Sequence, residues 1–373
     1  MKIGFDAKRA FNNTAGLGNF SRNTIAALAC QYPDDRFFLF NPSQNKTLFI
    51  APENSLELNP DGFWWKLFPN LWRSFRIGNK SVELNLDIYH GLSHELPLGI
   101  EYTGIKTLVT IHDLVYIRYP EYFKKVDRVI YNKKFRNACR IATCIHAISE
   151  QTKFDLNFFF DVPDKKIVVI YQAINPLFFS EITDAHRLAV LGKYQFREPF
   201  LLTVGTIEPR KNLMGLLKGM LSAKIHLPLV VVGKPTDYMQ EIQQLIDLHA
   251  TELKVFFLSS VDDADLHVLY QSAAVMIYPS VFEGFGLPVA EAQASGCPVI
   301  TSKISSLPEA GGDAALYIDP RLPEGIGIAI KGVLNKPNLR NSLIVKGRVN
   351  AKRFTPENYA RQMKQLYNSI LND

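Results

Sequence analysis

The chain has 373 residues, of which 47% are hydrophobic and 21% charged, and its formal net charge is +6. This length predicts about two domains, the recurring apolar runs exclude a disordered chain, and the small, dispersed charge argues against nucleic-acid binding. No apolar run approaches the roughly 18 residues of a membrane span, and no signal-peptide-like stretch begins the sequence. The four cysteines, Cys30, Cys139, Cys144 and Cys297, are scattered. We therefore expect a cytoplasmic protein with reduced thiols.

In the first half of the chain, short β-rich runs alternate with helical patterns, which predicts a parallel sheet built from βαβ units. The expected strands are Lys2–Asp6, Arg36–Phe40, Leu86–His90, Thr107–His112, Cys144–Ile148 and Ile167–Ile170. The expected helices are Asn19–Cys30, Arg128–Arg140 and Glu150–Phe159.

A polar, proline-punctuated stretch between Asn175 and Pro199 precedes a second alternating set. Its expected strands are Phe200–Val204, Leu229–Val232, Val255–Leu258, Val275–Tyr278, Val299–Thr301 and Ala315–Ile318, and its expected helices are Leu213–Leu221, Tyr238–His249, Asp263–Ser272 and Val289–Ser295. We predict an α/β protein of two doubly wound, Rossmann-like αβα domains, residues 1–178 and 179–355, facing each other across a cleft. Ligands of such sheets bind at the carboxyl ends of the strands.

The first candidate motif, Ala15–Ser21, lies between the first strand and the first helix and contains Gly16 and Gly18. Glycines let the backbone approach an anion, and a helix start offers N–H groups and a partial positive charge. The motif fits a phosphate-binding turn and a plain βα turn equally well. Because it lacks a third glycine, a dinucleotide-binding fingerprint is disfavoured.

The second motif, Val204–Leu213, joins the first strand of the second domain to a helix and carries Arg210 and Lys211. Two cations beside the positive end of a helix dipole are unfavourable without an anionic partner. Arginine offers a planar fork and lysine a point charge, so the pair favours a diphosphate ligand over a merely solvated helix start.

The third motif, Glu283–Glu291, places two carboxylates eight residues apart around a Gly-Phe-Gly turn. An ionised carboxylate only accepts hydrogen bonds, which suits sugar hydroxyls. We expect Glu283 in the loop and Glu291 about one turn into the following helix. A structural loop with two surface glutamates is the alternative, which the alanines around Glu291 disfavour.

In this order and spacing, the three motifs resemble those of the family 4 (group 1) retaining glycosyltransferases, which have the GT-B fold. The glutamate pair is similar to that family's E-x7-E signature, and further segments also fit: Ile111–Leu114, Ala147–Glu150, Leu307–Glu309 and Phe354–Leu371. The resemblance covers nearly the whole chain. It implies retaining transfer of a hexose from a nucleoside diphosphate sugar to a glycan or lipid-linked glycan acceptor in surface polysaccharide biosynthesis.

The resemblance also implies a role for each site residue. The diphosphate would lie against Gly16, Gly18, Arg210 and Lys211, and Thr206 stands where many relatives have an arginine. The donor sugar would contact Glu283 and the loop of Gly284, Phe285, Gly286 and Leu287, and the ribose would contact Glu291. Gly233 and the Ser260–Asp262 loop, with Val261, would line the base pocket. His112 would lie near the donor sugar and the acceptor, whereas on sequence alone His112 and Asp113 are more simply structural residues at a strand end.

No motif suited to a divalent cation is evident, since Asp262–Asp265 has the pattern of a helix cap. We therefore expect neither metal nor cofactor, with Arg210, Lys211 and helix N-termini stabilising the leaving diphosphate. The Glu208–Asn212 and His112–Leu114 sequences most resemble bacterial mannosyltransferases that use GDP-mannose. UDP-glucose, UDP-galactose and UDP-N-acetylglucosamine stay open as donors, and a nucleotide-sugar epimerase, a nicotinamide dehydrogenase or a non-catalytic binding module are the less favoured functions.

All three tryptophans fall within Phe63–Arg76, together with Lys66, Arg73 and Arg76. Mixed aromatic and basic side chains suit a membrane interface or a lipid-linked acceptor. A single aromatic cluster is more commonly part of a core, so we favour a helix that packs its aromatic side chains into the first domain. Peripheral contact with the inner face of the cytoplasmic membrane is the alternative.

The end of the chain predicts one more helix. Thr355 is a good N-cap residue and Pro356 suits the first helical position. Apolar side chains then form one stripe: Tyr359, Met363, Leu366, Tyr367, Ile370 and Leu371. The second domain already has a complete set of elements, and the resemblance implies that the closing helix crosses back. We therefore predict that residues 356–373 pack on the N-terminal domain.

Overall fold

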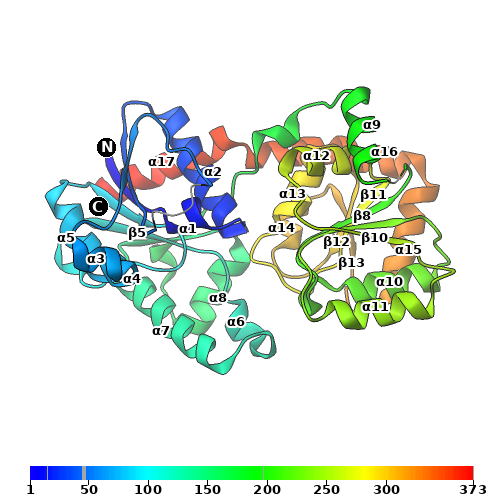
Figure 1. Ribbon diagram of the computed structural model, residues 1–373, viewed down its shortest axis with the longest axis horizontal. Coiled ribbons are helices and arrows are strands. Elements are labelled where there is room, and N and C mark those ends of the chain that lie inside the picture. Colours follow the sequence, from blue (N-terminus) through cyan, green and yellow to red (C-terminus); the bar gives the residue numbers. More distant parts are fainter. Residues whose placement is uncertain (15, 44–47, 196, 373) are drawn as a thin grey trace. The chain divides into compact units, whose positions relative to one another are not determined.

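Figure 1 shows a computed structural model of the chain, which describes residues 1–14, 16–43, 48–195 and 197–372. The chain divides into two compact units: unit 1 comprises Met1–Ala173 and the residues from Pro356 on, and unit 2 comprises Ile174–Thr355. Unit 2 thus begins before residue 179, where the sequence placed the boundary. The reason is the 3₁₀ turn η5 (Pro176–Phe179), whose buried Phe178 packs its ring against His267 and Tyr270 of unit 2.

Unit 1 contains a seven-stranded parallel sheet in the order β3-β2-β1-β4-β5-β6-β7. The strands are β1 (Lys2–Asp6), β2 (Arg36–Phe40), β3 (Ser55–Leu58), β4 (Ile88–Gly91), β5 (Lys106–Ile111), β6 (Cys144–Ala147) and β7 (Ile167–Val169). The order reverses between β1 and β4, and crevices at such switch points are where ligands of doubly wound sheets bind.

Two helical layers cover the sheet of unit 1 on opposite faces (Figure 1). One layer is α1 (Lys8–Asn12), α2 (Gly16–Gln31) and α17 (Pro356–Asn372). The other is α3 (Phe63–Leu67), α4 (Pro69–Leu71), the π-helical turn η1 (Trp72–Arg76), α5 (Ile77–Glu83), α6 (Val115–Arg118), α7 (Lys125–Ile141) and α8 (Glu150–Phe160). Short 3₁₀ turns link these elements at η2 (Ile100–Tyr102), η3 (Pro120–Tyr122) and η4 (Asp164–Lys166).

The C-terminal helix α17 completes the core of unit 1. Its apolar stripe is buried against α2 and the sheet through Tyr359, Ala360, Met363, Leu366, Tyr367 and Ile370. Polar contacts fix its register, because Tyr359 Oη lies 3.0 Å from Thr24 Oγ1 and Lys364 pairs with Asp35. Asp35 also accepts a hydrogen bond from the amino group of Met1 at 2.7 Å, so both ends of unit 1 meet at one carboxylate.

A buried chain of hydrogen bonds runs from α17 through the sheet. His146 Nε2 lies 2.8 Å from the carbonyl oxygen of Ile170, so this nitrogen must carry the proton and donate. The directions then follow back along the chain: Thr110 donates to His146, His90 Nε2 donates to Thr110, and Tyr367 donates to His90 Nδ1. Burial lowers the pKa of His146 to about 4 and that of His90 well below its ordinary value, which keeps both rings neutral.

Unit 2 contains a six-stranded parallel sheet in the order β10-β9-β8-β11-β12-β13. The strands are β8 (Leu201–Val204), β9 (Leu229–Val232), β10 (Val255–Leu258), β11 (Val275–Tyr278), β12 (Val299–Ser302) and β13 (Ala315–Ile318). Its helices are α9 (Asp184–Lys193), α10 (Leu213–Ser222), α11 (Met239–Leu248), α12 (Asp263–Ser272), α13 (Leu287–Ala294), α14 (Leu307–Gly311), α15 (Pro323–Asn335) and α16 (Pro337–Ala351). The prediction of two doubly wound units is confirmed.

The switch point of unit 2 lies between β8 and β11. Strand β11 is a fully buried run of Val, Met, Ile and Tyr, and β8 begins with two buried leucines and ends with the partly buried Thr203 and Val204. Such apolar runs are expected for the centre of a parallel sheet. Within the described parts of the chain, none of the helices is both long and apolar enough to cross a membrane.

Candidate functional site

The loop after β8 presents Arg210 and Lys211 at the switch point of unit 2. Gly205 adopts φ +140°, and a Cβ placed on it would lie 3.3 Å from Lys211 Cε, so the lysine stem packs directly over the glycine. Asn212, at φ +58°, caps α10 by accepting a hydrogen bond from Gly215 N at 3.2 Å. Its amide also donates to the carbonyl oxygens of Pro279 (3.2 Å) and Pro320 (2.7 Å). These contacts fix the loop against the end of β11.

Glu283, in the loop after β11, pairs with both cations. Its Oε1 lies 2.7 Å from Lys211 Nζ, and its Oε2 lies 2.8 Å from Arg210 Nη1. Lys211 also donates to the Tyr278 hydroxyl at 2.7 Å, and Arg210 pairs with Glu208 at 2.6 Å. The structure therefore brings together three residues that the sequence singled out separately. Tyr278, the last residue of β11, was missed as a member because it ends an apolar run.

The charges of this cluster set one another's ionisation. Burial alone would raise the pKa of Glu283, but Arg210 and Lys211 hold it at about 2. Burial lowers the pKa of Lys211, against the opposing effect of Glu283. Burial would also lower the pKa of Arg210, but the carboxylates of Glu283 and Glu208 raise it. Since two cations face two carboxylates, an incoming anion must compete with Glu283 and Glu208 for Arg210 and Lys211.

Two serines after β12 hold the Glu283 loop in place. Ser305 Oγ accepts from Glu283 N at 3.0 Å, and Ser306 Oγ donates to the carbonyl oxygens of Glu283 (2.8 Å) and Phe285 (2.9 Å). Sequence reasoning missed both serines, although they directly precede the Leu307–Glu309 motif. Phe285 is buried and its ring packs edge-on against Phe354.

The turn between Glu283 and α13 depends on Gly286. This residue lies at φ +110° as the N-cap of α13, and a Cβ on it would come within 2.8 Å of Leu307. Because Phe285 points into the core, the stretch Gly284–Leu287 has mainly backbone to offer a ligand. The family resemblance implies contact of this loop with the donor sugar, which stays a prediction, and such contact would be made mainly through backbone groups.

Glu291 lies one turn into α13, as expected, but outside the Arg210–Lys211–Glu283 cluster. Its Oε2 accepts a hydrogen bond from the Tyr270 hydroxyl of α12 at 3.2 Å. Burial, followed by the charge of Asp263, raises the pKa of Glu291 to about 8. The two glutamates of the motif therefore differ in ionisation: Glu283 is charged at neutral pH, and Glu291 is largely protonated.

The base-pocket residues lie at neighbouring strand ends of unit 2. Gly233 directly follows β9, and a Cβ on it would lie 1.9 Å from the carbonyl oxygen of Gly205, so packing alone requires glycine there. Val261 lies between Ser260, at φ +58°, and Asp262, the N-cap of α12. Thr206 is partly buried beside Gly205. Contact of these residues with a nucleotide stays a prediction.

In unit 1, Gly16 and Gly18 lie in the first turn of α2, which begins at Gly16 and not near Asn19 as expected. A Cβ on Gly18 would lie 1.8 Å from the carbonyl oxygen of Asn13, so close packing accounts for this glycine. Among the described residues, leaving out its chain neighbours and the nearby backbone of its own helix, none has an atom within 4 Å of a Cβ placed on Gly16. Ala15 of the same motif lies outside the described residues. Phosphate binding by this turn stays a prediction.

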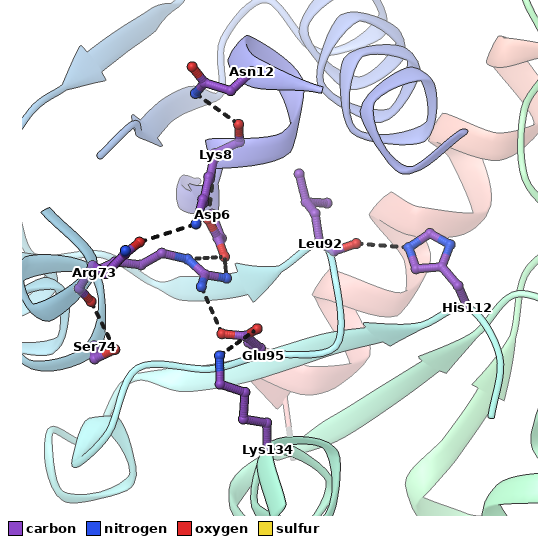
Figure 2. A network of polar contacts seen from close by, with 10 residues as sticks. Asp6, Lys8, Asn12, Arg73, Ser74, Leu92, Glu95, His112 and Lys134 are labelled. Atoms are coloured by element: carbon purple, nitrogen blue, oxygen red, sulfur yellow. Dashed lines mark hydrogen bonds and ion pairs between the residues drawn. The ribbon is translucent and has the colours of Figure 1, made fainter. Parts of the chain in front are cut away.

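His112 directly follows β5 and is buried (Figure 2). Its Nε2–H donates to the carbonyl oxygen of Leu92 at 3.0 Å, and its ring packs edge-on against Phe20. Burial lowers the pKa of His112 to about 4, so the ring is neutral and Nδ1 is left as the acceptor. Asp113 accepts from Val115 N at 3.1 Å at the start of α6. Both residues thus have structural roles, and contact of His112 with a donor stays a prediction.

A second charged network lies at the carboxyl ends of β1 and β4 (Figure 2). Arg73 pairs with Asp6, its Nε lying 2.9 Å from Oδ2, and its Nη1 lies 2.7 Å from Glu95 Oε2. Glu95 Oε1 in turn lies 3.2 Å from Lys134 Nζ of α7. Sequence reasoning missed Asp6 and Glu95, because a lone carboxylate after a strand carries no distinguishing pattern.

The prediction that the Phe63–Arg76 aromatics pack into the core is wrong for most of them. Trp72 is buried and Trp65 partly so, whereas Phe63 and Trp64 are 76% and 71% exposed. The physical reason is that α3 and α4 are only five and three residues long, so few of their side chains can pack against the sheet. The other aromatic side chains point into solvent.

Comparison with known proteins matches each unit to one family model. Residues 40–176 match "Glycosyltransferase Family 4", and residues 193–350 match "Glycosyl transferases group 1". The O-antigen chain mannosyltransferase B of Escherichia coli is 34% identical over 286 residues, covering 75% of this chain and 74% of that protein. The O-antigen chain mannosyltransferase RfbU of Salmonella typhimurium is 30% identical over 279 residues, covering 74% and 71%.

Among solved structures, Anabaena HepE in complex with UDP-glucose superposes with a TM-score of 0.74 at 16% identity, covering 99% of this chain and 100% of that one. At this identity the likeness concerns the fold.

Proposed function

We infer, from the premise that this chain belongs to the group 1 glycosyltransferases, that it transfers a hexose from GDP-mannose to a glycan or lipid-linked glycan acceptor in polysaccharide biosynthesis. Transfer retains the anomeric configuration and needs no metal ion. The enzyme would work in the cytoplasm, peripherally at the inner face of the cytoplasmic membrane. The mannosyltransferase relatives support the choice of mannose as the transferred sugar.

The observation that carries this proposal is the cluster of the buried Glu283 with the partly buried Arg210 and Lys211 at the β8–β11 switch point. A diphosphate arriving there would take over hydrogen bonds that both cations now give to Glu283. The carboxylate, released in part, could then accept hydrogen bonds from the hydroxyls of the sugar attached to that diphosphate. One cluster would thereby recognise both halves of the donor.

The same cluster supports the chemistry. When the bond from the sugar to the phosphate oxygen breaks, negative charge grows on the leaving diphosphate. Arg210 and Lys211 are already fixed beside it, so they stabilise that charge without reorganising. The acceptor hydroxyl attacks from the face that the diphosphate leaves, and the departing phosphate oxygen takes its proton.

A donor panel tests the proposal. Purified protein is incubated with GDP-mannose, UDP-glucose, UDP-galactose or UDP-N-acetylglucosamine, and thermal shift and release of nucleoside diphosphate are measured with and without glycan acceptors. We expect stabilisation and acceptor-dependent release of GDP with GDP-mannose. A preference for a UDP-sugar would show that the donor is that UDP-sugar and not GDP-mannose. Interconversion of sugars without transfer would indicate an epimerase, and binding without turnover would indicate a binding module.

Activity should survive excess EDTA. Arg210 and Lys211 supply the positive charge that a divalent ion provides in metal-dependent enzymes, so removing metal should change the transfer rate by less than about twofold. The measurement is release of nucleoside diphosphate before and after chelation, beside a metal-dependent glycosyltransferase treated identically. Loss of activity that magnesium or manganese restores would contradict metal independence.

Glu283→Gln and Glu291→Gln should affect the two halves of the donor differently. Glu283→Gln replaces a charged acceptor of sugar hydroxyls by a neutral amide with one acceptor oxygen, and it releases both cations from their ion pairs. Affinity for the sugar donor should therefore fall about tenfold or more, while affinity for the free nucleoside diphosphate is kept or increased. Glu291→Gln should weaken both ligands equally, because ribose is common to both. Calorimetric titration with GDP and GDP-mannose separates these outcomes, and equal effects of both substitutions would refute the assignment.

The pH dependence of GDP binding provides a control for Glu291. Its pKa of about 8 means that Glu291 becomes a charged, and therefore stronger, acceptor for the ribose hydroxyls only when it loses its proton. Affinity of the wild type should therefore rise from about pH 7 to about pH 9, by up to tenfold per unit below the pKa. The diphosphate adds little to this slope, since its last proton leaves near pH 6. Glu291→Gln should lack the slope.

A further inference from the structure

Unit 1 exposes a group of large apolar side chains that its own core does not cover. Six of them lie within thirteen residues of α3, α4 and η1 and form the aromatic patch: Phe63, Trp64, Leu67, Phe68, Leu71 and Phe75, each 46–76% exposed. Isolated exposed apolar residues are ordinary in soluble proteins, but a cluster of this size marks a surface that meets an apolar partner.

Helix α7 adds a second apolar surface, this one set among cations. Val126 and Val129 are each 70% exposed and Ile130 is 44% exposed. The helix carries six basic residues and one acidic residue, Asp127. Lys125 and Arg128 alternate with the exposed valines. Exposed aliphatic side chains interleaved with lysine and arginine are the pattern of a helix that lies in a membrane interface.

The aromatic patch and α7 belong to the same face of unit 1. Glu95 bridges Arg73 of η1 and Lys134 of α7 with its two oxygens, at 2.7 and 3.2 Å, as Figure 2 shows. Trp72 of η1 and Phe135 of α7 pack into one core cluster. Both elements therefore cover the side of the sheet opposite α2 and α17 (Figure 1).

A groove along α7 fits an anionic headgroup. It has a volume of about 420 Å³ and is lined by Lys125, Arg128 and Arg136 around the apolar Val129 and Phe159. Cations set beside apolar side chains match the phosphate and acyl parts of a lipid. A second copy of this chain fits poorly, because a symmetric contact would bring two strongly basic α7 helices together.

We propose that unit 1 docks on an anionic phospholipid bilayer through the aromatic patch and the outer face of α7. The aromatic side chains enter the interface between headgroups and acyl chains, where amphipathic rings are favoured. Lys125 and Arg128 contact the lipid phosphates. This inference extends the proposed peripheral location, but it involves neither donor nor acceptor, so vesicle binding tests it separately from transfer.

The test is flotation of the full-length protein with vesicles of phosphatidylcholine alone or of equal parts phosphatidylcholine and phosphatidylglycerol. We expect binding to the mixed vesicles only, weakened by salt. The double variant Trp64→Ser/Phe68→Ser should bind at least tenfold less. Lys125→Ala/Arg128→Ala should lose about fivefold for each charge removed. All four side chains are solvent-accessible, so the melting temperature should stay at the wild-type value.

Matched controls come from unit 2. Leu248→Ser/Ile328→Ser removes side chains that are 77% and 70% exposed, and Lys218→Ala/Lys331→Ala removes two exposed lysines. Neither should alter flotation. As an independent reading, tryptophan emission should shift to the blue on mixed vesicles, and Trp64→Phe should abolish most of the shift.

Three outcomes would overturn the proposal. The first is wild-type protein that fails to bind the mixed vesicles, and the second is an equal loss of binding in the unit 2 controls. The third concerns the oligomeric state, measured by light scattering. If the wild type is a dimer that Trp64→Ser/Phe68→Ser converts to a monomer, and vesicle binding does not change, the aromatic patch binds a second copy of the chain.

Discussion

Lys211→Ala is expected to abolish most of the transferase activity. The ammonium group of the partly buried Lys211 donates to Glu283 and to the Tyr278 hydroxyl, each at 2.7 Å, so its position is fixed before a ligand arrives. Removing a preorganised charge from a leaving diphosphate costs about 2–4 kcal/mol in the transition state, or a rate loss of about 30- to 1000-fold. Steady-state release of GDP from GDP-mannose measures it.

The matched control is Lys218→Ala, which removes an exposed lysine from α10 of the same unit and should leave the rate unchanged. Lys211→Arg should recover part of the loss, because it restores charge but not the geometry of a compact ammonium. Thermal melting must show that Lys211→Ala is folded. A folded variant that turns over within about twofold of wild type would mean that Lys211 does not face the diphosphate.

Removing α17 by ending the chain after Thr355 is expected to unfold unit 1 and leave unit 2 folded. Six side chains of this helix are buried, and each contributes on the order of 1.5–3 kcal/mol if large and apolar. The loss approaches the whole 5–15 kcal/mol, roughly, by which a folded protein is stabilised. All three tryptophans lie in unit 1, so their emission reports its unfolding, while hydrogen exchange of β8, β9 and β11 reports unit 2.

A milder variant separates packing from polar anchoring. Tyr367→Phe keeps the ring but leaves His90 Nδ1 without its donor, which should lower the free energy of unfolding of unit 1 by about 1–3 kcal/mol. Tyr102→Phe, at an 87% exposed position in the same unit, is the control. For the truncation after Thr355, the contrary result would be native tryptophan emission together with an unchanged melting transition. That result would show that unit 1 folds without α17.

The sequence predicted the buried strands of the fold better than the exposed ones. Every expected strand formed within two residues of its predicted bounds, because central strands of a parallel sheet are continuous apolar runs. Strand β3 was missed because it is a half-exposed edge without such a run. Helix α15 was missed because Gly325, Gly327 and Gly332 lower its helix propensity. A Cβ on Gly327 would lie 2.2 Å from Gly219 O of α10, so close helix packing, which sequence patterns do not show, requires that glycine.

The candidate site was predicted by residue type but not by pairing. Adjacent cations after β8 and a glutamate after β11 are visible as motifs, and doubly wound topology places both at one switch point. The sequence could not show that Glu283 pairs with both cations, since the partners are 72 and 73 residues apart in the chain. Nor could it separate the pKa values of Glu283 and Glu291, which depend on burial and on Asp263.

The meeting of Met1, Asp35 and Lys364 has a consequence for synthesis. Unit 1 is assembled from both ends of the chain, with the 182 residues of unit 2 translated in between. At roughly 5–20 residues per second, about 10 to 35 seconds pass between emergence of Ala173 and that of Pro356. During that interval the face of the nascent sheet that α1 and α2 share with α17 lacks its third helix, so apolar side chains that α17 will cover are exposed. Unit 2 is continuous in the chain and needs no later segment. We therefore expect unit 2 to complete its fold on the ribosome before unit 1, although most of unit 1 precedes it in the sequence.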